Sequence, residues 1–173
     1  MSRWADWFLV SLAEAEQFRS ASCLAECSDE AVCELLEPLL ERVEDLPIHV
    51  AMDKAWEPIH RCLTGDTGAA HEFDLNAGEY PLKLCVMGGE QLLKDGYRSA
   101  ALIAAKDVPA VAVALASISK DWFRGRFFAL PDNQFHEINE EAFEWAWAWF
   151  ENLPPFFAKA AEQGSAVICT ISH

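Results

Sequence analysis

The two ends of the chain carry short apolar runs that limit the folds open to it. The first run occupies residues 7–10, and the second occupies residues 165–171 and is rich in the β-branched side chains that favour strands. The second run is apolar on both sides of Cys169, as expected for a strand inside a sheet. Most of the intervening sequence has helical periodicity. We therefore expect the two runs to pair within one small sheet packed by helices, a mainly helical α+β architecture.

Two helical patterns follow the first run. Ser11 and Glu14 have the spacing of a capping box, which predicts a helix over residues 12–21. From Ser28 onward, apolar residues recur at steps of three and four and predict a helix with one buried face. Pro38 interrupts this pattern, so the helix either kinks there or gives way to a second helix. The opposite face is acidic and carries Glu30, Glu34, Glu37, Glu41 and Glu44.

Residues 53–65 combine a helix start, an apolar stripe and a glycine stop. Asp53 is placed to cap a helix, and Gly65 is placed to end it in the left-handed conformation. Alternatively, the helix starts at Glu57 with Pro58 as its first residue, where proline is tolerated. One face of this helix would carry Trp56, Ile59, His60 and Leu63.

The middle of the chain is less regular. Residues 66–81 are predicted to form a loop, and residues 82–87 a short strand or helical turn. Gly88 and Gly89 predict a tight turn with close backbone packing, because the third glycine and the acid of a dinucleotide fingerprint are missing. Residues 90–94 are predicted to form one or two helical turns. Asp107 then opens a helix with Pro109 in its first turn.

The second half of the chain is predicted to be helical up to its final strand. Residues 122–127 are predicted to form a short helix or turn whose Arg124 and Arg126 are expected to pair with glutamates. Asn139 is placed to cap a helix over residues 140–153, which Pro154 and Pro155 end, and a further helix covers residues 156–163.

The helix after Asn139 is apolar on two sides. One side carries Phe143, Ala146, Trp147 and Phe150, and the other carries Trp145 and Trp149. Such a helix is either sandwiched between layers, the interpretation we favour, or it presents an aromatic patch to a partner.

Length and charge narrow the classes of function. A chain of 173 residues with seven Trp and eleven Phe is expected to form one packed domain spanning residues 1–173. The net charge is −15, and it is concentrated in the first 47 and last 43 residues. Acidic surfaces disfavour nucleic acids and anionic membranes, and they attract basic proteins. The absence of an apolar signal core or spanning run predicts a cytoplasmic protein.

The chain contains six cysteines. Without a secretory signal, these are expected to be thiols and not a disulfide framework. Cys23, Cys27 and Cys33 lack the paired spacing of structural zinc sites, so we expect no metal and no cofactor.

The order of these segments resembles the YfbM-like family, a bacterial family of single-domain proteins of unknown function. The resemblance covers most of the chain. It is carried by residues 53–56 with Ile59-His60 and Leu63-Thr64-Gly65, then Pro81-Leu82, residues 86–89, residues 111–118, and Ala160-Ala161 to Gly164 before the final strand. The resemblance implies an α+β domain in the cytoplasm with no established enzymatic activity or cofactor. It therefore supplies no catalytic residues.

Two hypotheses of function remain. The first is a non-catalytic, acidic protein-binding module, for example an immunity-type inhibitor of a basic toxin. Its candidate partner surface consists of Glu30, Glu34, Glu37, Glu41, Glu44, Trp145 and Trp149. The alternative is a small-molecule-binding protein or enzyme, whose candidate pocket consists of Asp53, Trp56, His60, Gly88 and Gly89. No activated nucleophile, phosphate loop or metalloprotease motif supports this alternative.

Overall fold

The structure, a computed structural model, describes residues 4–23, 28–41, 49–67, 77–94, 97–131 and 137–172. Its centre is a five-stranded antiparallel sheet with the strand order β2-β1-β5-β4-β3. The strands are β1 (Trp4–Val10), β2 (His49–Ala51), β3 (Glu90–Lys94), β4 (Arg98–Ile103) and β5 (Ala166–Ser172). The predicted pairing of the two terminal runs is confirmed, because β1 and β5 pair over their full lengths, from Trp4 opposite Ser172 to Val10 opposite Ala166.

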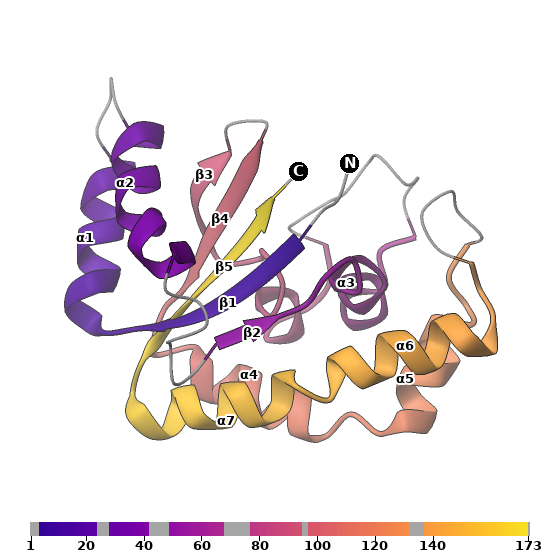
Figure 1. Cartoon of the computed structure of the whole chain (residues 1–173). Helices are drawn as coiled ribbons and strands as arrows, with labels where there is room; N and C mark the ends of the chain where they lie inside the picture. The colour runs from indigo at the N-terminus through magenta and orange to yellow at the C-terminus, as the bar shows by residue number, and fades with distance from the viewer. Residues whose placement is uncertain are drawn as a thin grey trace.

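Helices cover both faces of the sheet and make the fold α+β, as predicted (Figure 1). One face is covered by two helices, α1 (Leu12–Ser22) and α2 (Ser28–Glu41). The other face is covered by α3 (Trp56–Thr64), the 3-10 helix η1 (Leu82–Leu84), α4 (Val108–Ala116), α5 (Lys120–Phe127), α6 (Glu140–Phe150) and α7 (Leu153–Gln163). We call these the thin layer and the thick layer.

The central strands are buried on both sides because they separate two hydrophobic cores. In β5, Val167, Cys169 and Ile171 face the thick layer, whereas Ala166 and Ile168 face the thin layer. This alternation follows from the two-residue period of a strand. Because both faces of β5 are covered by a hydrophobic core, the final run of the sequence is apolar and does not alternate with polar residues.

Several predicted helix ends are confirmed. The Ser11 hydroxyl accepts a hydrogen bond from the Glu14 N–H at 3.2 Å, and the Glu14 carboxylate accepts one from the Ser11 N–H at 2.7 Å, which completes the capping box of α1. The Asn139 side chain accepts from the Ala142 N–H at 2.8 Å and caps α6. Gly65 ends α3 with φ of 75°.

The prediction of helical turns at residues 90–94 was wrong, because this segment is the edge strand β3. The register shifts between Gln91, which lies opposite Ala101, and Leu93, which lies opposite Ala100. The bulge brings two consecutive residues, Leu92 and Leu93, into the core under the thin layer. It therefore removes the alternation by which a strand is identified in sequence.

The start of α3 was also predicted incorrectly. The helix begins at Trp56, its N-cap is Ala55, and no side chain caps it, so Asp53 is not the cap. The other proposed start at Glu57 differs by one residue. Pro58 falls in the first turn, where its missing N–H has no acceptor within the helix.

Helix α2 continues through Pro38 to Glu41, so no second helix begins at the proline, and residues 42–48, which include Glu44, lie outside the described residues. Another boundary differs from the sequence-based expectation. Pro154 and Pro155 belong to the first turn of α7, which therefore starts at Leu153. Within the described part of the chain, no helix has the length and apolar character needed to cross a membrane.

Candidate functional site

Helix α3 lies at the centre of the thick layer and is buried almost all round. Every residue from Trp56 to Leu63 is buried, although three of these residues, Glu57, His60 and Arg61, are polar or charged. The His60 side chain is 1% exposed and the Arg61 side chain is fully buried. Charged groups are rarely buried in this way without a specific set of contacts.

The charges on α3 are held within the protein. The Arg61 Nε lies 3.4 Å from the Glu57 Oε1, and the Arg61 Nη1 donates to the Asp66 carbonyl at 3.5 Å. The Thr64 hydroxyl donates to the His60 carbonyl at 2.8 Å and tightens the last turn. These contacts join the helix to the segment after Gly65. Because removing one member of a buried ion pair strongly destabilises a protein, these contacts are expected to contribute to stability.

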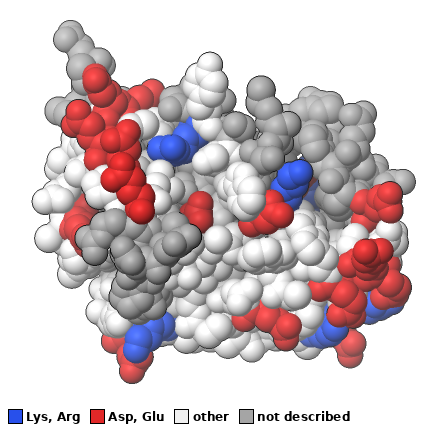
Figure 2. Space-filling view, viewed as in Figure 1, with Lys and Arg blue, Asp and Glu red and all other residues white. Residues whose placement is uncertain are grey.

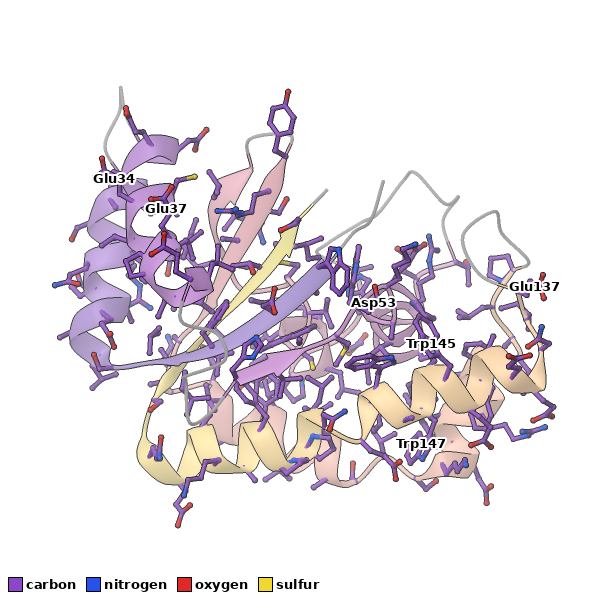
Figure 3. All side chains as sticks on the ribbon, viewed as in Figure 1. Glu34, Glu37, Asp53, Glu137, Trp145 and Trp147 are labelled. Atoms are coloured by element: carbon purple, nitrogen blue, oxygen red, sulfur yellow. The ribbon has the colours of Figure 1, made fainter. Side chains whose placement is uncertain are left out.

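The candidate pocket predicted from the sequence is divided in the structure. Trp56 and His60 are buried on α3, and Asp53 lies half-buried in the turn before it (Figure 3). Gly88 and Gly89 instead line a separate cavity of about 360 Å³ that none of those three residues lines. The cavity is bounded by η1, the start of β3, the end of β4 and the turn that leads into α4. We call it the Gly88–Gly89 cavity.

Close backbone packing explains the glycine pair, as the sequence predicted. A Cβ atom on Gly88 would lie 1.9 Å from the Lys83 carbonyl oxygen, and one on Gly89 would lie 2.4 Å from the Leu102 carbonyl oxygen. No side chain fits in either place. The two glycines therefore hold η1 and β4 against the same short turn.

A second cavity is a groove of about 820 Å³ between α1 and α2. Its apolar lining consists of Ala13, Ala21, Ala31 and Leu35, and its polar lining consists of Glu16, Gln17, Ser20 and Glu34. We call it the α1–α2 groove. It lies in the thin layer, on the opposite face of the sheet from α3 and α6.

The residues of the candidate partner surface do not form one surface. Glu34 and Glu37 project from α2 at the upper left, whereas Trp145 lies on α6 at the lower right (Figure 3). Glu30 and Glu41 are exposed on α2 as well. Trp145 is 36% exposed, while Trp149 is half-buried and packs against the core of the thick layer. The acidic part and the tryptophan part therefore belong to opposite faces of the sheet.

Helix α5 forms an ion pair with α6 and a ring contact of its own. Arg124 forms a two-pronged ion pair with Glu140, with the Nη1–Oε2 distance at 2.7 Å, which confirms the pairing predicted for this arginine. The hydrogen bond from Arg124 lowers the pKa of the Glu140 carboxyl. The guanidinium of Arg126 instead lies over the Trp122 ring at 5.0 Å.

The cysteines do not form a reactive or metal-binding group within the described ranges. No disulfide links the five cysteines found there, and no three His, Cys, Asp or Glu side chains gather in the geometry of a metal site. Cys27 lies outside those ranges. Burial raises the pKa of the Cys85 and Cys169 thiols, which disfavours the nucleophilic thiolate.

Comparison with known proteins assigns the chain to a family. A family model described as a domain of unknown function, DUF1877, matches residues 1–170. The chain belongs to the DUF1877 family. A crystal structure of YfbM, a protein of unknown function from Escherichia coli, is similar in fold, with a TM-score of 0.64 and 17% identity over 99% of both chains. No curated protein matches the chain. The predicted YfbM-like family is thus confirmed.

In this DUF1877 protein, sequence reasoning missed the residues that complete both cavities. The α1–α2 groove uses Ala13, Gln17 and Ala31, whose small or neutral side chains carry no recognisable signal. The Gly88–Gly89 cavity draws Arg19 from α1 and Lys106 from the turn before α4, both far from the glycines in sequence. Of the residues that line the two cavities, only the pair Gly88 and Gly89 could have been identified from the sequence.

Proposed function

We propose that this DUF1877 protein is a non-catalytic, acidic protein-binding module that takes up a basic amphipathic helix of a partner protein in the α1–α2 groove. The observation that carries the proposal is an apolar groove with carboxylates at its edges. An amphipathic helix offers the complementary pattern, with apolar residues on one side and basic residues beside them. An immunity-type inhibitor of a basic toxin is one concrete form of such a module.

The floor of the groove supports binding of an apolar side chain. Ala21 and Ala31 are small and leave room between the two helices, and Leu35 is only partly buried. When a partner covers an exposed apolar surface, the burial favours binding by roughly 25 cal/mol per Å². Leucine or methionine side chains of a partner helix suit this floor.

The charge on α1 and α2 supports a basic partner. The two helices carry seven acids (Glu14, Glu16, Asp29, Glu30, Glu34, Glu37 and Glu41) and one base, Arg19. That base is already engaged, because its Nε lies 2.8 Å from a carboxylate oxygen of Glu90. Figure 2 shows the acidic side chains gathered over α2 at the upper left. This charge steers a basic protein toward the groove and raises its association rate.

The buried state of α3 favours binding over catalysis. His60 is the residue on which a general-base mechanism would depend, and its imidazole is buried away from both cavities. A general base must reach the proton that it removes. We propose that the partner is met in the cytoplasm, which is supported by the unbridged, buried thiols of Cys62, Cys85 and Cys169.

A synthetic peptide tests the proposal. We expect a 16-residue amphipathic helix of leucine and lysine to bind the protein saturably in a fluorescence anisotropy titration, and a scrambled peptide of equal composition to bind far more weakly. Replacing two groove carboxylates, Glu16→Gln with Glu34→Gln, should weaken binding about tenfold. Ala31→Trp should fill the groove and abolish binding while circular dichroism stays unchanged.

The matched control removes two carboxylates from the opposite face. Glu141→Gln with Glu151→Gln changes the net charge equally, but both residues are exposed at α6. This pair should change the dissociation constant less than twofold. If it weakens binding as much as the groove pair, or if the scrambled peptide binds equally well, the attraction is that of an acidic surface and the groove is not the site.

A further inference from the structure

We propose that the Gly88–Gly89 cavity binds a small metabolite through an oxyanion, a phosphate or carboxylate carried on a compact body. This site lies apart from the α1–α2 groove and is independent of the function proposed above. The inference starts from charge. In a chain with a net charge of −15, three basic side chains, Arg19, Lys83 and Lys106, line one cavity.

The two lysines supply the charge that is available to a ligand. Arg19 and Glu90 neutralise each other across the cavity, with the Nε–Oε2 distance at 2.8 Å. Lys83 and Lys106 form no ion pair with the residues that the structure describes. An ammonium group of this kind is a compact charge with three donors, which suits a phosphate or carboxylate oxygen.

One carboxylate remains at the cavity and limits the choice of ligand. Asp107 lines it and accepts a hydrogen bond from the Tyr80 hydroxyl at 3.3 Å, a neutral donor that leaves the carboxylate charge in place. Two ammonium groups therefore outnumber one carboxylate. A ligand whose oxyanion lies between Lys83 and Lys106, and whose body carries a hydroxyl or amino group toward Asp107, would satisfy all three side chains.

The frame of the cavity is rigid where the ligand would lie. Gly88 packs on the carbonyl of Lys83, so the glycine fixes the backbone from which the Lys83 side chain extends. Met87, directly before the glycines, is fully buried at φ of 60°, a conformation uncommon for a residue with a side chain. Its carbonyl accepts a hydrogen bond from the Gln91 side chain at 2.5 Å. Backbone strain of this kind is concentrated at binding and catalytic sites.

The volume of the cavity selects a metabolite over a larger ligand. About 360 Å³ lies at the lower end of the range of small-molecule sites. It has no room for a helix. The acidic surface elsewhere on the molecule also disfavours a polyanion, whose other phosphates would be repelled.

Isothermal titration calorimetry of the full chain tests the site, with inorganic phosphate and succinate as separate probes. We expect saturable one-to-one binding of at least one of them, and the probe that binds identifies the oxyanion. Lys83→Met with Lys106→Met should weaken that binding by about tenfold per lysine, because each removes a charged donor. Lys54→Met is the matched control, since Lys54 is an exposed lysine that does not line the cavity.

Three results would overturn the proposal. The first is the absence of saturable binding of both probes to the unaltered protein. The second is an unchanged dissociation constant in the Lys83→Met/Lys106→Met variant, provided that its unfolding midpoint matches that of the parent. The third is an equal loss of affinity in Lys54→Met, which would mean that binding depends on the overall charge of the protein and not on the lysines of the cavity. None of these results bears on peptide binding in the α1–α2 groove.

Discussion

The two faces of the sheet are covered in different ways. On the thick layer, the ring centroid of Phe123 lies 6.4, 5.5 and 5.0 Å from those of Phe143, Trp147 and Phe150, and α3 buries the charged side chains of Glu57 and Arg61. On the thin layer, only two helices of the described chain cover the sheet, with Phe18, Val32 and Leu36 among the buried side chains, and their charges point to solvent. Aromatic rings fill space on the first face, and alanines leave a groove on the second.

This difference separates stability from recognition. A face packed by interlocking aromatic side chains contributes much of the burial free energy of the fold and has little freedom to change. A face covered by only two helices leaves apolar surface and charged side chains exposed, and these can contact a partner. Both cavities involve α1, and neither is lined by a residue of α3, α5, α6 or α7. The α1–α2 groove therefore lies in the thin layer, whereas the Gly88–Gly89 cavity is lined by Arg19 of the thin layer and by η1 of the thick layer.

The largest expected effect comes from a pair of matched phenylalanine truncations. Phe123→Ala in the thick layer should lower the free energy of unfolding by about 4 kcal/mol, because the surrounding rings cannot collapse into the space. Phe18→Ala on α1 should cost about 3 kcal/mol, because a two-helix layer relaxes more easily. Both side chains are buried, at 0% and 3% exposure. Urea denaturation measures both values, and equal losses would remove the distinction between the layers.

The fold was predictable where local chemistry and periodicity agree. The β1–β5 pairing follows from two apolar runs, and the starts of α1 and α6 follow from Ser11 and Asn139. The prediction failed at β3, where a bulge puts Leu92 and Leu93 on one side. It failed again at Asp53, whose spacing suits a cap although the helix begins three residues later.

The second largest effect tests the charges buried in the thick layer. Arg61→Met should cost about 3 kcal/mol, since it removes the buried guanidinium that lies 3.4 Å from the Glu57 carboxylate. Glu57→Gln combined with Arg61→Met should recover at least half of that loss, because no charge then remains at the pair. Chemical denaturation of both variants measures the coupling. A double variant less stable than Arg61→Met would show that the pair is not the reason for the loss.

The candidate sites were less predictable than the fold. Sequence reasoning grouped Glu34 with Trp145 because acids attract a basic partner and tryptophan is enriched at interface hot spots, yet the sheet lies between their helices. Which helix covers which face depends on tertiary packing, and no local signal in either segment carries it. Gly88 and Gly89 were recognisable as a site of close packing, but Lys106 reaches their cavity only through the pairing of β3 with β4.

The smallest effect compares the helix caps of the two layers. Ser11→Ala should cost about 0.5 kcal/mol, because its partner, the Glu14 N–H, is exposed and can bond to water instead. Asn139→Ala should cost about 1 kcal/mol, because the Ala142 N–H is partly buried and less able to find water. Thermal unfolding ranks the two variants, and hydrogen exchange at Glu14 and Ala142 locates the change. A larger loss from Ser11→Ala would mean that α1 contributes more to the cooperative core than its exposed first turn indicates, and that the thin layer is not the weaker of the two.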